Sequence, residues 1–225
     1  MSWLVDFYRS AIGKKAVMAV TGIILFGFVL GHMLGNLKIY EGAEKLNKYG
    51  AWLRTFGTPA LPHEGMLWAA RIVLLLAVIL HVDSATRLTL MNRAARPIDY
   101  KKKEDVAATY AARTMRWGGV IVLLFILYHL LDFTFGTVNP DFREGEIYHN
   151  VLASFSNVWI SAFYIVANIA LGFHLYHGLW SMFQSMGWNH PTFNHWRRTF
   201  ATLFAVIITV GNVMFPISVM AGWVR

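Results

Sequence analysis

Five histidines lie inside stretches of sequence that are otherwise apolar enough for lipid. His32, His81 and His129 each stand in a different apolar run, and a fourth run holds both His174 and His177. An ionisable side chain at the centre of a bilayer is costly, so such residues tend to face the bundle interior and mark function. A single histidine there is equally well explained by a hydrogen bond between helices. One histidine in each of four successive runs favours a shared chemical role.

The composition places the chain in a membrane. Of its 225 residues 56% are hydrophobic and only 14% are charged, which is unusual for a soluble domain. The chain has no cysteine, which excludes disulfides, thiolate-bound iron–sulfur clusters and covalently attached haem. The net charge of +8 comes from basic residues in short segments between the apolar runs, a pattern that indicates membrane orientation rather than nucleic-acid binding.

Five apolar windows are long enough to cross a hydrocarbon core of about 30 Å. They cover residues 16–37, 67–90, 117–136, 157–184 and 199–223. The first window lacks a small-residue cleavage site, so we expect a retained span rather than a signal peptide. The excess of basic residues on the side of the N-terminus predicts a cytoplasmic N-terminus and a C-terminus outside. We therefore expect one all-α integral membrane domain over residues 1–225, whose first four helices form an up-down bundle.

The segment after the first span has an amphipathic pattern. Leu46, Tyr49, Trp52, Leu53 and Phe56 share one helical face, with charged residues opposite. An interfacial helix on the outer surface and an ordinary ordered loop both fit this pattern.

The intramembrane histidines fall at two depths. At about 1.5 Å per residue, His81 and His174 lie roughly 15 Å from the cytoplasmic ends of their spans, whereas His32 and His129 lie about 24 and 18 Å away. Spans one and three, and spans two and four, face each other diagonally across an up-down bundle, where cofactor sites are built. We call His81 and His174 the inner pair, and His32 and His129 the outer pair. Two opposed imidazoles suit an iron porphyrin with both axial positions filled, which transfers electrons rather than activating oxygen.

Zinc and ordinary helix packing compete with haem for the same residues. Zinc is disfavoured because its tetrahedral ligands must converge on one point, whereas these histidines lie at two levels. His177 shares a helical face with His174, and periodicity does not separate the two. Glycines near the histidines leave room for a porphyrin edge or serve helix packing; they are Gly27, Gly31, Gly35, Gly172 and Gly178.

Two motifs carry a family resemblance that extends over essentially the whole chain. The stretches SAIGKKAVMAVTGIILFGFVLGHMLGNL at 10–37 and FHLYHGLWSMFQSMGW at 173–188 resemble the membrane-anchor cytochrome b subunit of succinate:quinone oxidoreductases, in its single-chain type with five helices and two haems. The resemblance implies one axial ligand from each of the first four spans, paired one with three and two with four. In the fourth-span motif, F-H-x-x-x-G-[LM]-W-S, the ligand position corresponds to His174. The motif leaves His177 a hydrogen bond near the haem edge or a packing role.

The resemblance also implies cofactors and partners. Two b haems and a quinone, with menaquinone favoured, are expected in a cell inner (cytoplasmic) membrane. A flavoprotein that handles succinate or fumarate and an iron–sulfur subunit are expected on the cytoplasmic side. The basic connector between spans two and three offers them a docking surface, although a solvated loop that obeys the positive-inside rule would look the same. Its basic residues are Arg87, Arg93, Arg96, Lys101, Lys102, Lys103, Arg113 and Arg116.

Four residues near the outer end of span two are candidates for the quinone and haem surroundings. The resemblance suggests Glu64 for proton exchange with a quinone, with Arg54 and His63 nearby, and Arg71 as a partner of haem propionates. Glu64 is explained equally well as a carboxylate that interacts with the helix dipole, and Arg71 as a cation that snorkels to the surface.

Two further classes of function remain open from the residues alone. One is a cytochrome b anchor for another dehydrogenase, of the hydrogenase or formate type. The other is a haem-free transporter or structural anchor whose histidines form a proton relay. The chain also departs from some fumarate-reducing relatives, which carry a carboxylate just before the fourth ligand where Gly172 and Phe173 stand here. Neither residue supplies the carboxylate that a proton-compensating role at this position would need.

Overall fold

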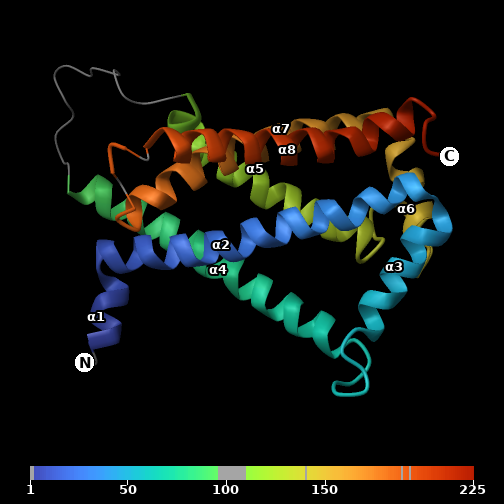
Figure 1. Cartoon of the computed structure of the whole chain (residues 1–225), viewed down its shortest axis with the longest axis horizontal. Helices are drawn as coiled ribbons and strands as arrows, with labels where there is room; N and C mark the ends of the chain where they lie inside the picture. Colours follow the sequence, from blue (N-terminus) through green and yellow to red (C-terminus); the bar gives the residue numbers. More distant parts are fainter. Residues whose placement is uncertain (1–2, 96–109, 140, 189, 193) are drawn as a thin grey trace.

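The described part of the chain is entirely helical, as predicted (Figure 1). The computed structural model describes residues 3–95, 110–139, 141–188, 190–192 and 194–225, with the side chains of 110–114 set aside. Five helices in this part are long and apolar enough to cross a membrane, which confirms the five-span prediction. They are α2 (Ala11–Asn36), α4 (Gly65–Ala94), α5 (Tyr110–Phe133), α7 (Val158–Ser185) and α8 (Asn194–Met220).

The helix ends differ from the predicted windows where glycine turns intervene. The third window was predicted to reach residue 136, but α5 ends at Phe133. Gly136 has a φ of +68°, and a Cβ there would overlap the Phe142 ring, so the chain has to turn at this position. Likewise α8 runs through Pro216 and ends at Met220, short of the predicted 223, with Gly222 at a φ of +70°.

Short helices cover the ends of the bundle. They are α1 (Trp3–Arg9), the 3₁₀ helix η1 (Leu37–Glu41), α3 (Ala43–Thr55) and α6 (Ile147–Phe155). For the segment after span one, the sequence left a helix and an ordered loop open. The structure has a helix there, because α3 covers most of the segment and buries Leu46 against the core. The location of α3 at a membrane surface stays a prediction. The helices α1 and α6 were not predicted.

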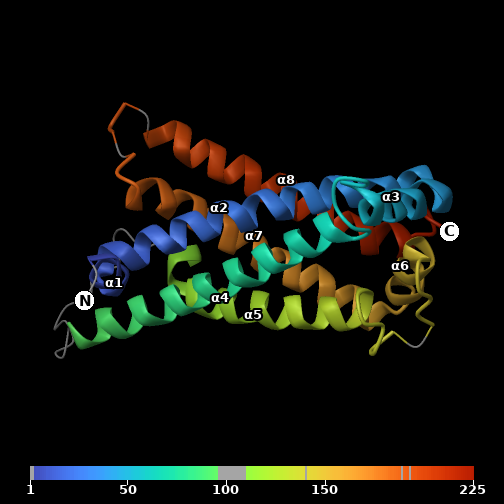
Figure 2. The same cartoon turned by 90° about the horizontal axis from the view of Figure 1, so that it is seen from below.

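The spanning helices associate in two groups (Figures 1 and 2). One group contains α2 packed against α4, and the other contains α7 packed against both α5 and α8. The pairs α2–α5 and α4–α7 are not among those whose backbones approach closely. The two termini lie at opposite ends of the long axis (Figure 1). The side chains that bridge the two groups are therefore of particular interest.

Packing in the second group depends on small residues. A Cβ added to Gly172 of α7 would overlap Thr209 Oγ1 of α8, so only glycine permits this approach of the two helices. Large apolar side chains elsewhere on the spans point outward: Leu75 is 61% exposed and Val166 is 62% exposed. Such outward apolar faces are expected where lipid is the solvent.

A partly buried ion pair joins the start of α2 to α4. Lys14 Nζ lies 2.9 Å from Asp83 Oδ2, and the Tyr8 hydroxyl donates to the same oxygen over 2.9 Å. The Lys14 ammonium also sits 3.4 Å from the centroid of the Tyr8 ring, and Arg87 pairs with the second oxygen of Asp83 at 2.7 Å. Lys14 contributes to the excess of basic residues on the side of the N-terminus, and the structure pairs it with Asp83.

Candidate functional site

The outer pair joins α2 to α5. The ring centroids of His32 and His129 lie 5.7 Å apart, with the ring planes at 89°. Phe28, one turn before His32, stacks on it at 5.2 Å, while Phe125 and Phe133 pack around His129. Helical spacing puts each phenylalanine on the same face as its histidine. The outer pair therefore sits in an aromatic environment that holds both rings toward each other.

The inner pair joins α4 to α7. The ring centroids of His81 and His174 lie 6.3 Å apart. His177, three residues beyond His174, is partly buried and makes no ring contact with the inner pair in the described part of the chain. The four histidines that the sequence singled out thus meet as two opposed pairs.

Both separations suit a metal held between two imidazoles. A metal–imidazole bond is about 2 Å long. If one metal binds both rings, the ring centroids are separated by two such bonds and by the distance from each centroid to its nitrogen, which gives about 6 Å in all. The pairs also bridge α2–α5 and α4–α7, the helices whose backbones stay apart, as a flat macrocycle between them would require. No cluster of three or more metal-binding side chains occurs among the described residues, so the histidines meet as pairs and not as a tetrahedral zinc site.

The hydrogen bonding of the ring nitrogens also indicates whether the histidine pairs fit a metal. Within the described chain, Nδ1 of His129 and Nδ1 of His174 are buried without a hydrogen-bond partner. An unpaired buried nitrogen costs free energy, and a metal bond to that nitrogen would offset the cost. The histidine pairs therefore fit the haem that the resemblance implies.

Thr21 orients the His81 ring. Its hydroxyl donates to the carbonyl of Val17 over 2.7 Å, and its oxygen lies 3.1 Å from His81 Nδ1. Because the threonine hydrogen is already used, Nδ1–H of His81 is the donor, and Nε2 keeps the lone pair that binds a metal. Thr21 was not predicted from the sequence, since a threonine in an apolar helix is common.

Two glycines beside the inner pair were not predicted either. A Cβ added to Gly22 of α2 would lie 3.6 Å from His81 Cε1, and one added to Gly119 of α5 would lie 3.7 Å from His174 Cε1. Each glycine precedes the outer-pair histidine of its own helix by ten residues, or about 15 Å. The sequence could have revealed this spacing. In both helices that carry an outer-pair histidine, it puts a glycine beside the inner pair.

The five glycines that the sequence placed near the histidines have different neighbours. A Cβ on Gly35 would lie 2.8 Å from the Tyr49 ring, so Gly35, like Gly172, serves helix packing. A Cβ on Gly27 or Gly31 would meet no atom within 4 Å, and one on Gly178 would meet only Met115 at 3.9 Å. The space beside Gly27 and Gly31 is thus open, whereas Gly35 and Gly172 lie in close contacts between helices.

Gly119 offers a test with a neighbouring control. On the expectation from the sequence that each histidine pair holds one haem, Gly119→Leu should displace the His174 ring. The haem at the inner pair should then fall by at least half, with the haem at the outer pair retained. Gly118→Leu should retain both, because a Cβ there meets nothing within 4 Å. Haem content of the purified variants measures both effects, and equal losses in the two variants would contradict the expectation.

The candidates near the start of α4 are brought together only in part. Arg54 Nε lies 3.2 Å from Glu64 Oε1, and the amide of Glu64 donates to the Arg54 carbonyl over 2.7 Å. These contacts join the end of α3 to the start of α4. His63 is exposed, and Arg71 stacks on Trp68, with 4.9 Å from the guanidinium carbon to the ring centroid. The structure therefore pairs Arg54 with Glu64 and leaves His63 and Arg71 apart from that pair.

Most of the predicted basic docking surface falls outside the described residues: Arg96, Lys101, Lys102 and Lys103, together with the side chain of Arg113. A different basic cluster, which was not predicted from the sequence, lies where α7 ends and α8 begins. The guanidinium carbons of Arg197 and Arg198 lie 5.0 and 5.1 Å from the Trp180 ring centroid.

Comparison with known proteins adds independent evidence. Residues 95–214 match the family model described as succinate dehydrogenase/fumarate reductase transmembrane subunit. This match covers His129 and His174 but neither His32 nor His81. The comparisons with curated proteins and with solved structures each gave no match.

Proposed function

The chain belongs to the family of succinate dehydrogenase/fumarate reductase transmembrane subunits, and on this premise we propose that it carries electrons between an iron–sulfur subunit and a membrane quinone through two b haems. Members of this family are membrane subunits that associate with the other subunits of such complexes. The further details, which are the number of haems, the ligands and the quinone, are our proposal.

The observation that carries this proposal is the meeting of four intramembrane imidazoles as two opposed pairs, with centroids 5.7 and 6.3 Å apart. His32 and His129 would hold the outer haem, and His81 and His174 the inner one. A haem held by two histidines would supply one-electron transfer and would leave no open position for oxygen or substrate. The chain's own contribution is to space the irons across the bundle and to fix the rings, as Thr21 does for His81.

The distribution of basic residues supports a proposal for the membrane orientation and for the end of the bundle where the partner subunits dock. The flavoprotein and iron–sulfur subunits would dock at the end of the bundle that carries the N-terminus, which we propose to be cytoplasmic in an inner (cytoplasmic) membrane. The inner pair lies nearer that end, so an electron from the iron–sulfur subunit would reach it first. His177 would then serve packing or a hydrogen bond beside the inner haem.

A quinone, with menaquinone favoured, would bind at the opposite end, near the start of α4. The support for this site is the Arg54–Glu64 pair, whose side chains are 35% and 29% exposed, with His63 exposed close by in sequence. A partly exposed carboxylate held by one arginine can exchange protons with a ligand that approaches it. Arg71, one turn after Trp68, stays our candidate for the outer haem propionates.

Purification of the intact complex through a tag on this chain tests the proposal. We expect flavin and iron–sulfur subunits to co-purify, and succinate to reduce part of the b haem or fumarate to oxidise the reduced haem. Reduction by hydrogen or formate instead would assign the chain to another dehydrogenase. A haem-free chain that purifies alone would favour the transporter or structural anchor.

A further inference from the structure

Asp132 of α5 is fully buried, and no charged side chain pairs with it in the described part of the chain. The carboxylate of Asp83 differs because Lys14 and Arg87 neutralise it. Burying a charge without a partner is unfavourable. Some positive charge is therefore expected near Asp132.

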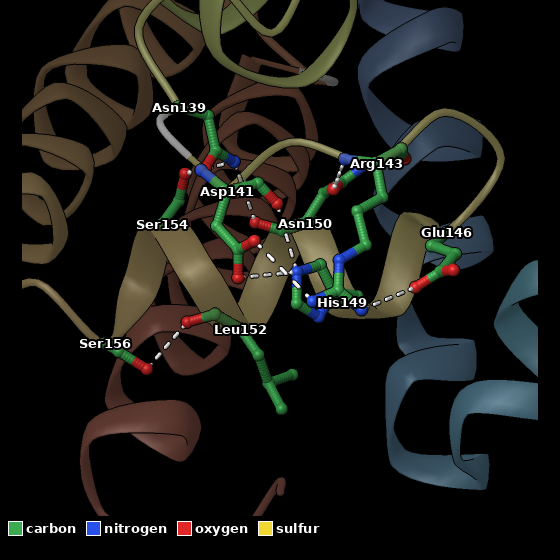
Figure 3. A network of polar contacts seen from close by, with 9 residues as sticks. All are labelled: Asn139, Asp141, Arg143, Glu146, His149, Asn150, Leu152, Ser154 and Ser156. Atoms are coloured by element: carbon green, nitrogen blue, oxygen red, sulfur yellow. Dashed lines mark hydrogen bonds and ion pairs between the residues drawn. The ribbon is translucent and has the colours of Figure 1, made fainter.

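The hydrogen bonds around Asp132 suit an ionised carboxyl group. Asn139 Oδ1 accepts from the amide of Asp141 over 3.3 Å, which fixes its Nδ2 as the donor to Ser154 Oγ over 3.1 Å (Figure 3). Ser154 then donates its own hydrogen to Asp132 Oδ1 over 2.5 Å, and the Tyr164 hydroxyl donates to Oδ2 over 2.8 Å. Both carboxyl oxygens thus accept hydrogen bonds, as a carboxylate does.

The Asp132 carboxyl group lies beside the outer pair. Asp132 follows His129 by three residues, which is less than one turn of α5. The ring of Tyr164, whose hydroxyl binds Asp132, packs against His129 with 6.0 Å between centroids. Phe133 and Phe155 pack against the same tyrosine, so the surroundings are apolar and a charge acts strongly there.

We propose that the Asp132 carboxylate is the counter-charge of the ferric outer haem and lowers its midpoint potential. The inference rests on the proposed function. Ferric iron carries one more positive charge than ferrous iron, so a fixed negative charge nearby stabilises the ferric form more. Near the inner pair, the described carboxylate is that of Asp83, whose charge Lys14 and Arg87 offset.

The test is Asp132→Asn in the whole complex, followed by a redox titration monitored by haem spectra. We expect the ferric–ferrous equilibrium of the outer haem to shift about tenfold toward the ferrous form, a rise of about 59 mV, with the inner haem unchanged. Asp141→Asn is the control, since its carboxylate lies on the surface, paired with His149, and it should move neither potential. Two bound haems with an unmoved outer potential in Asp132→Asn would overturn the inference.

If Asp132→Asn does not assemble, a second variant tests the role of the Asp132 charge. Tyr164→Phe removes one donor and keeps both the ring and the charge of Asp132, so the outer potential should stay at or below that of the unmodified complex. A rise would overturn the inference, because it would show that the network acts through structure and not through charge. Absence of haem from the unmodified complex would instead refute the proposed function.

Discussion

Replacing His129 by alanine is expected to halve the haem content of the complex, from two haems per chain to one. The outer iron would lose one of its two axial nitrogens, and the remaining ligand, His32, lies on a helix whose backbone does not pack closely against α5. The inner pair uses α4 and α7 and shares no side chain with the outer pair. The pyridine haemochrome assay on purified complex gives the count.

Two further variants serve as comparisons for His129→Ala. His195→Ala removes an exposed histidine and should leave both haems bound. In His129→Gly, added imidazole should restore the second haem and its six-coordinate spectrum, because the free ligand fits where the side chain was removed. Retention of both haems in His129→Ala would contradict the assignment of this residue.

The second large effect separates two neighbouring histidines. We expect His174→Ala to lose the inner haem and His177→Ala to keep both, because only the His174 ring faces His81, at 6.3 Å. The electron path from the partner subunits would be broken in the first variant and intact in the second. Haem content together with the rate of haem reduction by succinate measures both.

The reverse pattern, with haem lost from His177→Ala alone, would exchange the roles of the two residues. Since both variants remove the same side chain within one turn of α7, general damage to the helix should affect them equally. A difference between them therefore reports on ligation.

The sequence predicted much of this architecture for a simple physical reason. A bilayer requires about 20 apolar residues per helix, which makes the five spans visible, and polar side chains are so costly there that His32, His81, His129 and His174 stand out. Their depths follow from counting residues at a constant rise per residue. The two levels could therefore be assigned before any contact was known.

The roles of Asp132 and Thr21 could not be predicted from the sequence, because they depend on contacts between helices. Asp132 is one acidic residue near a predicted helix end, and only the positions of Ser154 and Tyr164 make it a buried carboxylate with two donors. The helix α6, which supplies Ser154, is too short for periodicity to identify. Thr21 was missed because its role requires knowing that α2 lies beside α4.

The ends of the helices were predicted less well than their middles. Hydropathy changes gradually near a membrane surface, whereas α5 ends sharply because Gly136 adopts a positive φ and Phe142 packs against it. The short connection from α3 to α4 likewise depends on the Arg54–Glu64 contact, which joins residues ten apart.

The central claim is that two opposed histidine pairs each hold one haem. The most direct test is the number of iron atoms per chain in the purified complex, together with its reduced-minus-oxidised optical spectrum. We predict two irons of b haem per chain, after the iron of the partner subunits has been subtracted, with spectra typical of two axial imidazoles. A folded complex in which this chain holds no haem, or holds one haem that survives alanine substitution of all four paired histidines, would contradict the claim.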